Sequence, residues 1–291
     1  SFYRRFLLNI PNWSSTETIL KKGEKKEDFD NESVLERFKI QLEHSNIKAN
    51  NTLKPDFYVK GPDYQDHNDD VTGNIKFDYH IPENLTDRAN LFKQSLTYSR
   101  PIWVAGSTHS KEEEVILDAH RDILDNYPDL LLIIAPRRPE RFHAVNNLIA
   151  KKGFSFMRRS EQDEMKLDDV QVLLADVLGE LPIYYSVSNV SFVGGSLFHV
   201  GGHNLLEPAS LNCPVITGPV LFGVEDIANM LLANDALKIV HNSDELSDLV
   251  SLLLSDENMQ KSMIKGASGV IEANKGSLEE LLKMIEPLLE N

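Results

Sequence analysis

The distribution of apolar residues changes near residue 70 of the 291-residue chain. Before that point polar and charged residues dominate: residues 21–30 are almost wholly charged, and residues 45–70 hold four Asn, five Asp and two Pro. Residues 33–44 alone carry apolar side chains at helical spacing within this polar stretch. Such a composition is typical of exposed loops and linkers. We therefore expect a boundary near Asp70, which divides the chain into residues 1–70 and 71–291.

From residue 71 onward, short apolar runs alternate with stretches whose apolar residues recur at helical spacing. The apolar runs predict strands at 102–105, 130–135, 170–174, 190–193, 215–217 and 237–240. The other stretches predict helices at 111–126, 139–152, 180–188, 205–211, 225–233, 243–254, 257–274 and 277–289. This alternation predicts an α/β domain with a Rossmann-like, doubly wound parallel sheet covered by helices.

Composition narrows the class of protein. Hydrophobic residues make up 41% of the chain, enough for a sizeable core, and the formal net charge of −15 argues against nucleic acid as a partner. The single cysteine, Cys213, cannot form an internal disulfide and predicts a small buried residue. No apolar run is long enough to span a membrane. The chain begins at Ser1 rather than Met, so we expect a soluble piece of a longer protein.

Ligands of doubly wound sheets bind beyond the carboxyl ends of the strands, so the loops at these ends are candidate sites. The loop that begins at Gly106 contains Ser107, Thr108 and His109, just before a predicted helix. Small residues, hydroxyls and free N–H groups at a helix start suit an anion. The alternative is that Ser107 or Thr108 is a plain N-cap.

Three arginines follow Pro136, which ends the predicted strand 130–135: Arg137, Arg138 and Arg141. Their guanidinium groups suit a phosphate or a base edge, although pairing with Glu140 at the surface is the alternative. Residues 176–181 form a further strand-to-helix junction with Gly179, Glu180 and Leu181. There a carboxylate is favourable near a helix start for dipole reasons alone.

The glycine-rich segment 194–207 is the strongest local signal. Its backbone N–H groups are predicted to hold a phosphate, and a carboxylate at its end could hold a ribose. The spacing of Asn204 and Glu207 also fits a capping box, which needs no ligand. That alternative does not account for the glycines or for the histidine. The residues concerned are Gly194, Gly195, Ser196, Gly201, Gly202, His203, Asn204, Leu205, Leu206 and Glu207.

The sequence lacks the motifs of several other enzyme classes. The sequence holds no P-loop, no His-Glu-x-x-His, no Gly-x-Ser-x-Gly and no strict Gly-x-Gly-x-x-Gly after a strand. The nine histidines show no metal-ligand spacing. We expect no metal and no cofactor.

Taken together, these loops resemble the 3-deoxy-D-manno-octulosonic acid (Kdo) transferases, a family of GT-B glycosyltransferases that act in lipopolysaccharide assembly. The resemblance runs from about residue 71 to the end of the chain, and its parts occur in the family's order. The matching segments are 73–78, 103–109, 136–142, Asp176 with 179–181, 192–197 and 201–209.

The resemblance implies the C-terminal, donor-binding half of an inverting enzyme that transfers Kdo from CMP-Kdo to the lipid A precursor. It places Pro136, Arg137, residues 179–181 and residues 204–207 around CMP, and it assigns transition-state stabilisation to Lys76. With the loops above, the expected donor-binding residues are Ser107, Thr108, His109, Pro136, Arg137, Gly179, Glu180, Leu181, Gly195, Ser196, Gly201, Gly202, His203, Asn204, Leu205, Leu206 and Glu207.

The resemblance also implies that an acceptor half supplies the catalytic base, a glutamate in a Ser-x-Gly-Glu-like stretch. No such stretch precedes Lys76, so we expect residues 1–70 to be a remnant of that half and this chain alone to bind the donor without catalysing transfer. The full protein is expected at the cytoplasmic face of the inner membrane, with membrane contact only through its missing part. Two alternatives stay open: a GT-B domain for a UDP-sugar, and a non-catalytic nucleotide-binding module.

Overall fold

The computed structural model describes residues 74–96, 98–161, 166–280 and 283. The chain divides into two compact units, one of Ile81–Ala273 and one of Ser1–His80 with Asn274–Asn291. The predicted boundary near Asp70 and the expected acceptor remnant lie outside the described residues. In the smaller unit, the Asp78 carboxylate accepts hydrogen bonds from the N–H groups of Gly276 and Leu278, at 2.7 and 2.8 Å.

The larger unit is built on a parallel sheet, and its order within the described residues is β3-β4-β2-β1-β5-β6-β7. The central strand β1 pairs in parallel with both β2 and β5, so that Val104 lies opposite Ile133 on one side and Ser191 on the other. The seven strands are β1 (Ile102–Thr108), β2 (Leu131–Pro136), β3 (Phe156–Arg158), β4 (Val172–Leu174), β5 (Val190–Val193), β6 (Val215–Thr217) and β7 (Leu237–Ile239).

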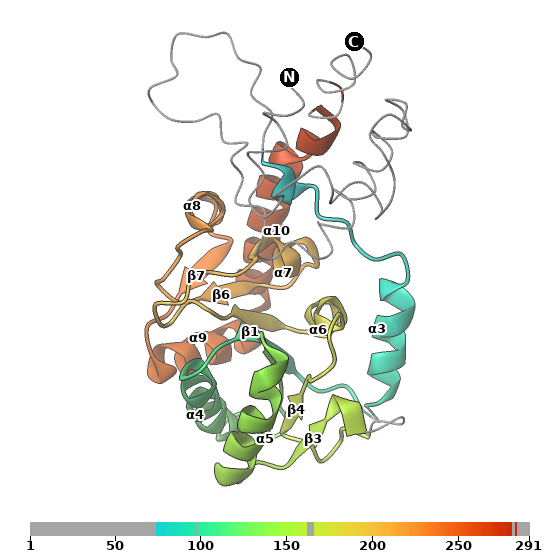
Figure 1. Cartoon of the computed structure of the whole chain (residues 1–291), viewed down its shortest axis with the longest axis vertical. Coiled ribbons are helices and arrows are strands. Elements are labelled where there is room, and N and C mark those ends of the chain that lie inside the picture. Colours follow the sequence, from blue (N-terminus) through green and yellow to red (C-terminus); the bar gives the residue numbers. More distant parts are fainter. Residues whose placement is uncertain (1–73, 97, 162–165, 281–282, 284–291) are drawn as a thin grey trace, which may run out of the picture. The chain divides into compact units, whose positions relative to one another are not determined.

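Helices cover both faces of this sheet (Figure 1). The α-helices are α3 (Leu85–Gln94), α4 (Glu112–Leu124), α5 (Phe142–Lys151), α6 (Leu181–Val187), α7 (Leu206–Ser210), α8 (Glu225–Ala233), α9 (Ser243–Ser255) and α10 (Glu257–Asn274). Within the described residues there are also three short 3-10 helices, η3 (Ile75–Phe77), η4 (Pro139–Arg141) and η5 (Arg159–Glu161).

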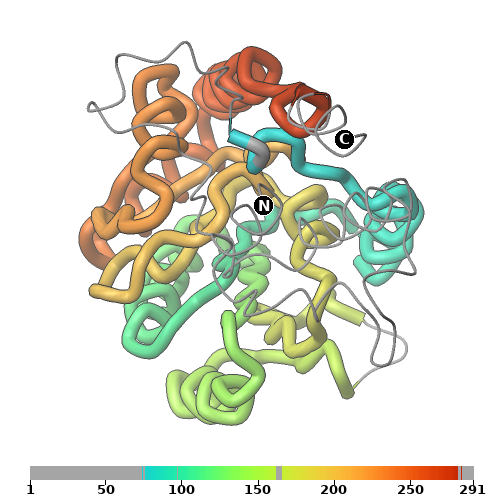
Figure 2. Tube along the Cα trace, turned by 45° about the horizontal axis from the view of Figure 1, so that its top comes forward, coloured from blue at the N-terminus to red at the C-terminus, as the bar shows by residue number. Residues whose placement is uncertain are grey.

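Alternation along the central strands produces two cores. Trp103 and Leu132 face the core formed with α4, α5 and α9, whereas Val104 and Ile133 face the core formed with α3 and α6. The tube in Figure 2 shows α3, in cyan, on a different side of the sheet from α4 and α5, in green. Since both faces are buried, the central strands are continuous apolar runs, as the sequence predicted.

The predicted α/β architecture is confirmed, with three local differences. β1 continues through Thr108, so Ser107 and Thr108 belong to the strand rather than to a loop. The N-cap of α4 is Lys111, so neither of those two residues caps the helix. Helix α3 and strand β3 were not predicted. Of the predicted helix 277–289, the structure describes residues 277–280, which are helical, and residue 283.

Candidate functional site

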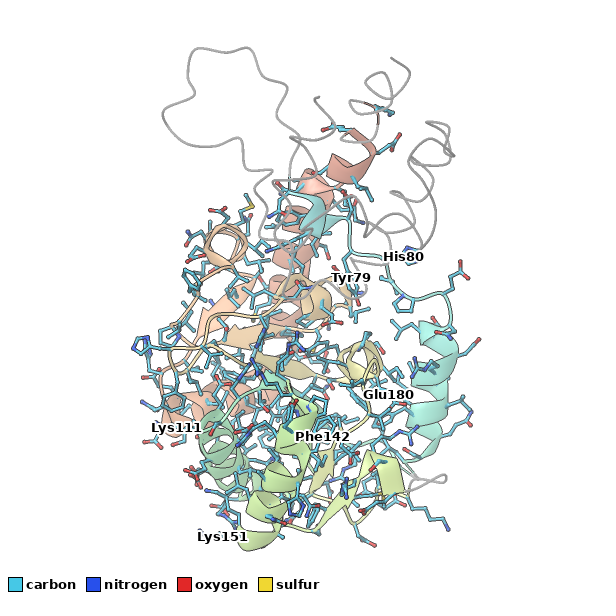
Figure 3. All side chains as sticks on the ribbon, viewed as in Figure 1. Tyr79, His80, Lys111, Phe142, Lys151 and Glu180 are labelled. Carbon is cyan, nitrogen blue, oxygen red and sulfur yellow. The ribbon has the colours of Figure 1, made fainter. Side chains whose placement is uncertain are left out.

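The carboxyl ends of β1 and β5 lie side by side at the point where the strand order reverses. The chain leaves β1 toward β2 on one side, and it leaves β5 toward β6 on the other. In open parallel sheets this reversal leaves room beyond the strand ends, which is where ligands bind. The loop after β1 meets the glycine-rich loop after β5 here. Figure 3 labels Lys111, Phe142 and Glu180, which lie at the starts of α4, α5 and α6.

A fully buried carboxylate joins these two loops. Oε2 of Glu112 accepts hydrogen bonds from the N–H groups of His109 and Gly195, at 2.9 and 2.8 Å. Its Oε1 accepts from those of Ser196 and Leu197, at 2.9 and 3.0 Å. Charge-assisted bonds of this kind offset the desolvation of a buried charge. The N–H groups of Gly195 and Ser196 therefore hold Glu112, not a phosphate as the sequence predicted.

Steric constraints explain why glycines occupy the loop after β5. Gly195 has φ +77°, and a Cβ there would overlap the carbonyl oxygen of Gly201 and the ring of His203. Gly201 itself has φ +113°, which side chains rarely adopt. A Cβ on Gly202 would overlap Val224. Close packing of the loop thus accounts for glycines that the sequence analysis assigned to ligand binding.

Two histidines meet across the strand reversal. The Nε2 atoms of His109 and His203 are 2.8 Å apart, and their rings stack with a centroid distance of 5.0 Å and an interplanar angle of 12°. Burial is the main cause that lowers the pKa of both rings, and the pKa of His203 falls to about 4. Both are therefore neutral near pH 7. One Nε2 must then carry the proton that the other accepts.

The arginine segment after β2 lies next to this pair. Arg137, Arg138 and Arg141 each contribute to the lowered pKa of His109. The backbone N–H of Arg137 donates to the Thr108 carbonyl at 2.9 Å, which ties the segment to the end of β1. The site thus combines a neutral imidazole pair with a concentration of positive charge.

One of these arginines has a buried partner. Arg141 pairs with Glu113 at 3.1 Å, and the side chain of Glu113 is 1% exposed. The partner expected from the sequence was Glu140, which lies between Arg138 and Arg141. Burial is the main cause that raises the pKa of Glu113, against the opposing effect of Arg141.

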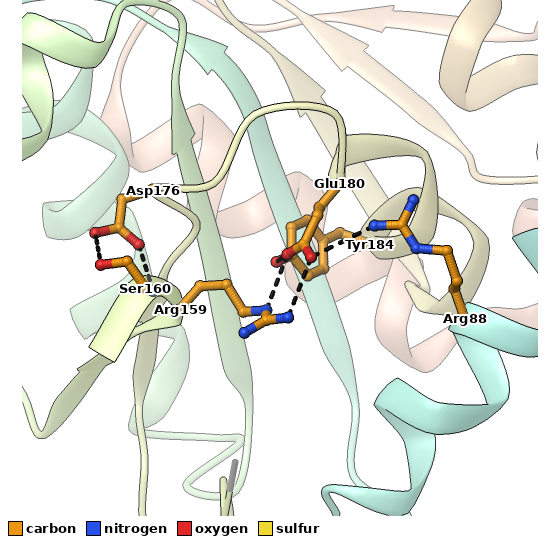
Figure 4. A network of polar contacts seen from close by, with 6 residues as sticks. All are labelled: Arg88, Arg159, Ser160, Asp176, Glu180 and Tyr184. Carbon is orange, nitrogen blue, oxygen red and sulfur yellow. Dashed lines mark hydrogen bonds and ion pairs between the residues drawn. The ribbon is translucent and has the colours of Figure 1, made fainter. Parts of the chain in front are cut away.

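Glu180 lies in a network of polar contacts (Figure 4). Its carboxylate accepts hydrogen bonds from the Tyr184 hydroxyl at 2.6 Å, from Arg159 at 2.9 and 3.2 Å, and from Arg88 at 3.4 Å. It occupies the N-cap position of α6 but makes no capping hydrogen bond. Two arginines, rather than the helix dipole alone, therefore balance this buried charge. Because Arg88 and Arg159 are far from Glu180 in the sequence, no local pattern predicted these contacts.

Asp176 lies nearby in the same view. Its carboxylate accepts from the backbone N–H and the hydroxyl of Ser160, at 2.8 and 2.6 Å, and pairs with Arg158 at 2.8 Å. Burial alone would raise the pKa of Asp176, but these hydrogen bonds outweigh burial and hold the pKa below its usual value. This junction is a structural anchor for the loop 176–180.

The start of α7 differs from the predicted capping box. Leu205 is the N-cap and makes no side-chain cap, and the Asn204 side chain accepts from the N–H of Leu206 at 3.0 Å. Glu207 lies in the first turn and is half-buried. The N-cap is therefore Leu205 rather than Asn204, so the predicted capping box does not form as expected.

The predicted donor-binding residues fall into two groups by exposure. Those with solvent-accessible surface are Ser107, His109, Arg137, Gly179, Leu181, Gly201, Gly202, His203, Asn204 and Glu207. The buried ones are Thr108, Pro136, Glu180, Gly195, Ser196, Leu205 and Leu206. Ser196 is satisfied internally, since its hydroxyl donates to the Val193 carbonyl and accepts from the N–H of Gly218. Lys76 lies in η3, in the smaller unit.

Among the described residues, no group of three or more His, Cys, Asp or Glu side chains has an arrangement that could hold a metal ion. No helix in the same part of the chain is long and apolar enough to cross a membrane.

Comparison with known proteins places this fold and site in a class. Residues 99–270 match the model of the family "Glycosyl transferases group 1". That stretch covers more than half of the chain and includes the whole strand reversal. The chain belongs to this family of glycosyltransferases.

Within this class, the chain is similar to 3-deoxy-D-manno-octulosonic acid transferases. It is 40% identical to that of Haemophilus influenzae over 76% of this chain and 52% of the relative. It is 33% identical to that of Rickettsia felis over 75% and 47%. The chain spans about half the length of these relatives. The resemblance to Kdo transferases inferred from the loops is thereby confirmed.

A solved structure gives the same result. The C-terminal CMP-Kdo binding domain of WaaA from Acinetobacter baumannii matches with a TM-score of 0.60 and 33% identity, over 64% of this chain and 97% of that domain. The expected assignment to the C-terminal half of a GT-B enzyme is confirmed.

Proposed function

We propose that this chain binds CMP-Kdo as the donor half of an inverting glycosyltransferase, which transfers Kdo to the lipid A precursor in lipopolysaccharide synthesis. The observation that carries the proposal is the match to nearly the whole length of a CMP-Kdo binding domain. The nucleotide would lie beyond β1 and β5, beside Arg137 and the two histidines. Asn204 and Glu207 would contact its ribose and phosphate.

The chemistry of transfer fits the charges at this site. When CMP leaves the sugar, negative charge develops on its phosphate and positive charge on the sugar. Fixed cationic donors stabilise that state more than the ground state, and they do so without a metal ion. Arg137 and Arg138 supply such charge in the larger unit. We assign to Lys76 the same role in the complete enzyme, where a carboxylate base from the N-terminal acceptor half activates the acceptor hydroxyl.

Calorimetric titration of the chain with CMP and with UDP tests the proposal. We expect CMP to bind and UDP to bind more weakly. A clear preference for UDP would assign the domain to another nucleotide sugar and refute the proposal. Absence of binding to either nucleotide would refute it as well.

The role of Glu207 can be tested in the same assay. Glu207→Ala should abolish CMP binding without unfolding the domain, as a cooperative melting curve would show. Asp248→Ala removes an exposed carboxylate from α9, away from the site, and should change neither property. If Glu207→Ala lowers stability and leaves CMP binding intact, Glu207 serves the fold and not the ligand.

A further inference from the structure

The His109–His203 pair has capacity for one more proton. In the neutral pair, one Nε2–H donates to the other Nε2 across 2.8 Å. The donor ring then has a lone pair on Nδ1, which is outside this contact. A proton added at that Nδ1 gives an imidazolium that still donates through Nε2. A second added proton would turn two N–H groups toward each other at 2.8 Å, so the geometry admits one proton and not two.

Without a bound anion, the charges around the pair disfavour protonation of either ring. Arg137, Arg138 and Arg141 all disfavour a positive charge on His109, and Arg137 disfavours one on His203. Glu112 favours it, but burial of the rings outweighs that effect. Arg141 is partly balanced by Glu113. Three arginines and a neutral imidazole pair thus share one edge of the sheet.

An anion placed there reverses the balance. A doubly charged phosphate beside the arginines cancels their field at the imidazoles and adds a negative charge of its own. A nearby opposite charge raises the pKa of histidine, and burial strengthens this effect because screening is weak. Protonation then adds a further positive charge for the phosphate to contact.

We propose that His109 and His203 form a phosphate-recognition element that takes up one proton, as a unit, when a phosphate monoester dianion binds. The proposal rests on the proposed function, because it places the phosphate of CMP at this edge. The proton comes from solvent and is bound at the Nδ1 of one ring. The element favours the dianion that CMP becomes when its bond to the sugar breaks, so it stabilises the charge that develops during transfer.

Calorimetry in buffers with different ionisation enthalpies measures the proton directly. The chain is titrated with CMP at about pH 8, where the phosphate, with a pKa of about 6, is already doubly charged. We expect an uptake of about one proton for each CMP bound. Cytidine, which lacks the phosphate, should bind without proton uptake.

Variants locate the proton. His203→Gln and His109→Gln should each abolish the uptake and weaken CMP binding several-fold, while the melting curve shows that the domain is folded. His241→Gln changes an exposed histidine at the start of α9 and should keep the full uptake. In ¹H–¹⁵N spectra of the histidine side chains, CMP should produce the imidazolium signature at His109 or His203.

The outcomes separate the two proposals. If CMP binds with no proton uptake, or if the uptake persists in both glutamine variants, the histidine proposal is refuted and the CMP site stands. If CMP does not bind at all, both proposals fail. Uptake that is lost in both variants and kept in His241→Gln supports the histidine proposal.

Discussion

Replacement of Glu112 by glutamine tests whether one buried carboxylate holds the two loops of the site together. The carboxylate accepts four backbone hydrogen bonds, two on each oxygen. A glutamine has one carbonyl oxygen, so it keeps two of the four. Its NH₂ group then faces the two remaining N–H donors, and in either orientation a buried N–H, of Gly195 or of Ser196, loses its partner.

The magnitude follows from these two lost bonds. The buried donor left without a partner costs about 1–3 kcal/mol and the loss of the partly buried bond about 0.5–1.5 kcal/mol, so Glu112→Gln should lower the free energy of unfolding by about 1.5–4.5 kcal/mol. A domain of this kind has a total stability of about 5–15 kcal/mol, so the loss is large enough to measure. The same change should loosen the contact between His109 and His203, because Glu112 binds the N–H of His109 directly.

Urea unfolding followed by circular dichroism measures the effect. Glu114→Gln is the matched control, since it removes the same charge from an exposed position of α4. The control should lie within about 0.5 kcal/mol of the parent chain. If Glu112→Gln also falls within that margin, the four hydrogen bonds do not stabilise the site and the reasoning is wrong.

Two further predictions concern stability. In the folded chain the pKa of His120 is about 3 and that of His203 about 4, against 6.5 for an unperturbed ring. Between pH 6.5 and pH 4 the unfolded chain therefore binds more protons than the folded chain. The free energy of unfolding should then fall as the pH drops from 6.5 toward 4. In urea titrations over this range, the slope for His120→Gln should be shallower by about 1.4 kcal/mol per pH unit, and an unchanged slope would contradict the assignment. Within α10, Gly269→Ala meets open space and should stabilise the chain by about 0.5–1 kcal/mol, whereas Gly266→Ala meets the backbone carbonyl of Asn234 and should destabilise it. Thermal melts that rank the two alanine variants in the opposite order would refute this packing argument.

The His120 prediction also shows how a buried polar group is satisfied. The indole N–H of Trp103 donates to His120 Nδ1 at 3.1 Å, and Nε2 lies 3.0 Å from the carbonyl of Gln171. These neighbours fix the neutral tautomer with its proton on Nε2. Together with burial, the donor facing Nδ1 explains why the ring resists a second proton. No local pattern in the sequence predicted this contact.

Glu180 illustrates the limit of local reasoning. The sequence placed it correctly at the start of a helix, where a carboxylate is favourable. Its partners Arg88 and Arg159 are 92 and 21 residues away, on elements that the sequence analysis did not predict. Because ion pairs across such separations depend on how elements pack, residue spacing alone could not identify them.

The sequence by itself determined the parallel sheet, the helices that cover it and the edge at which ligands of such sheets bind, because strands buried on both faces are continuous apolar runs and parallel strands end at one edge. It also contained the motifs of the family. Only the tertiary structure decided what the glycine-rich loop holds. Its N–H groups bind Glu112, 83 residues away from Gly195, and its histidine meets His109, 94 residues away. A loop rich in N–H donors binds whichever anion the fold places there, and that choice depends on packing rather than on local sequence.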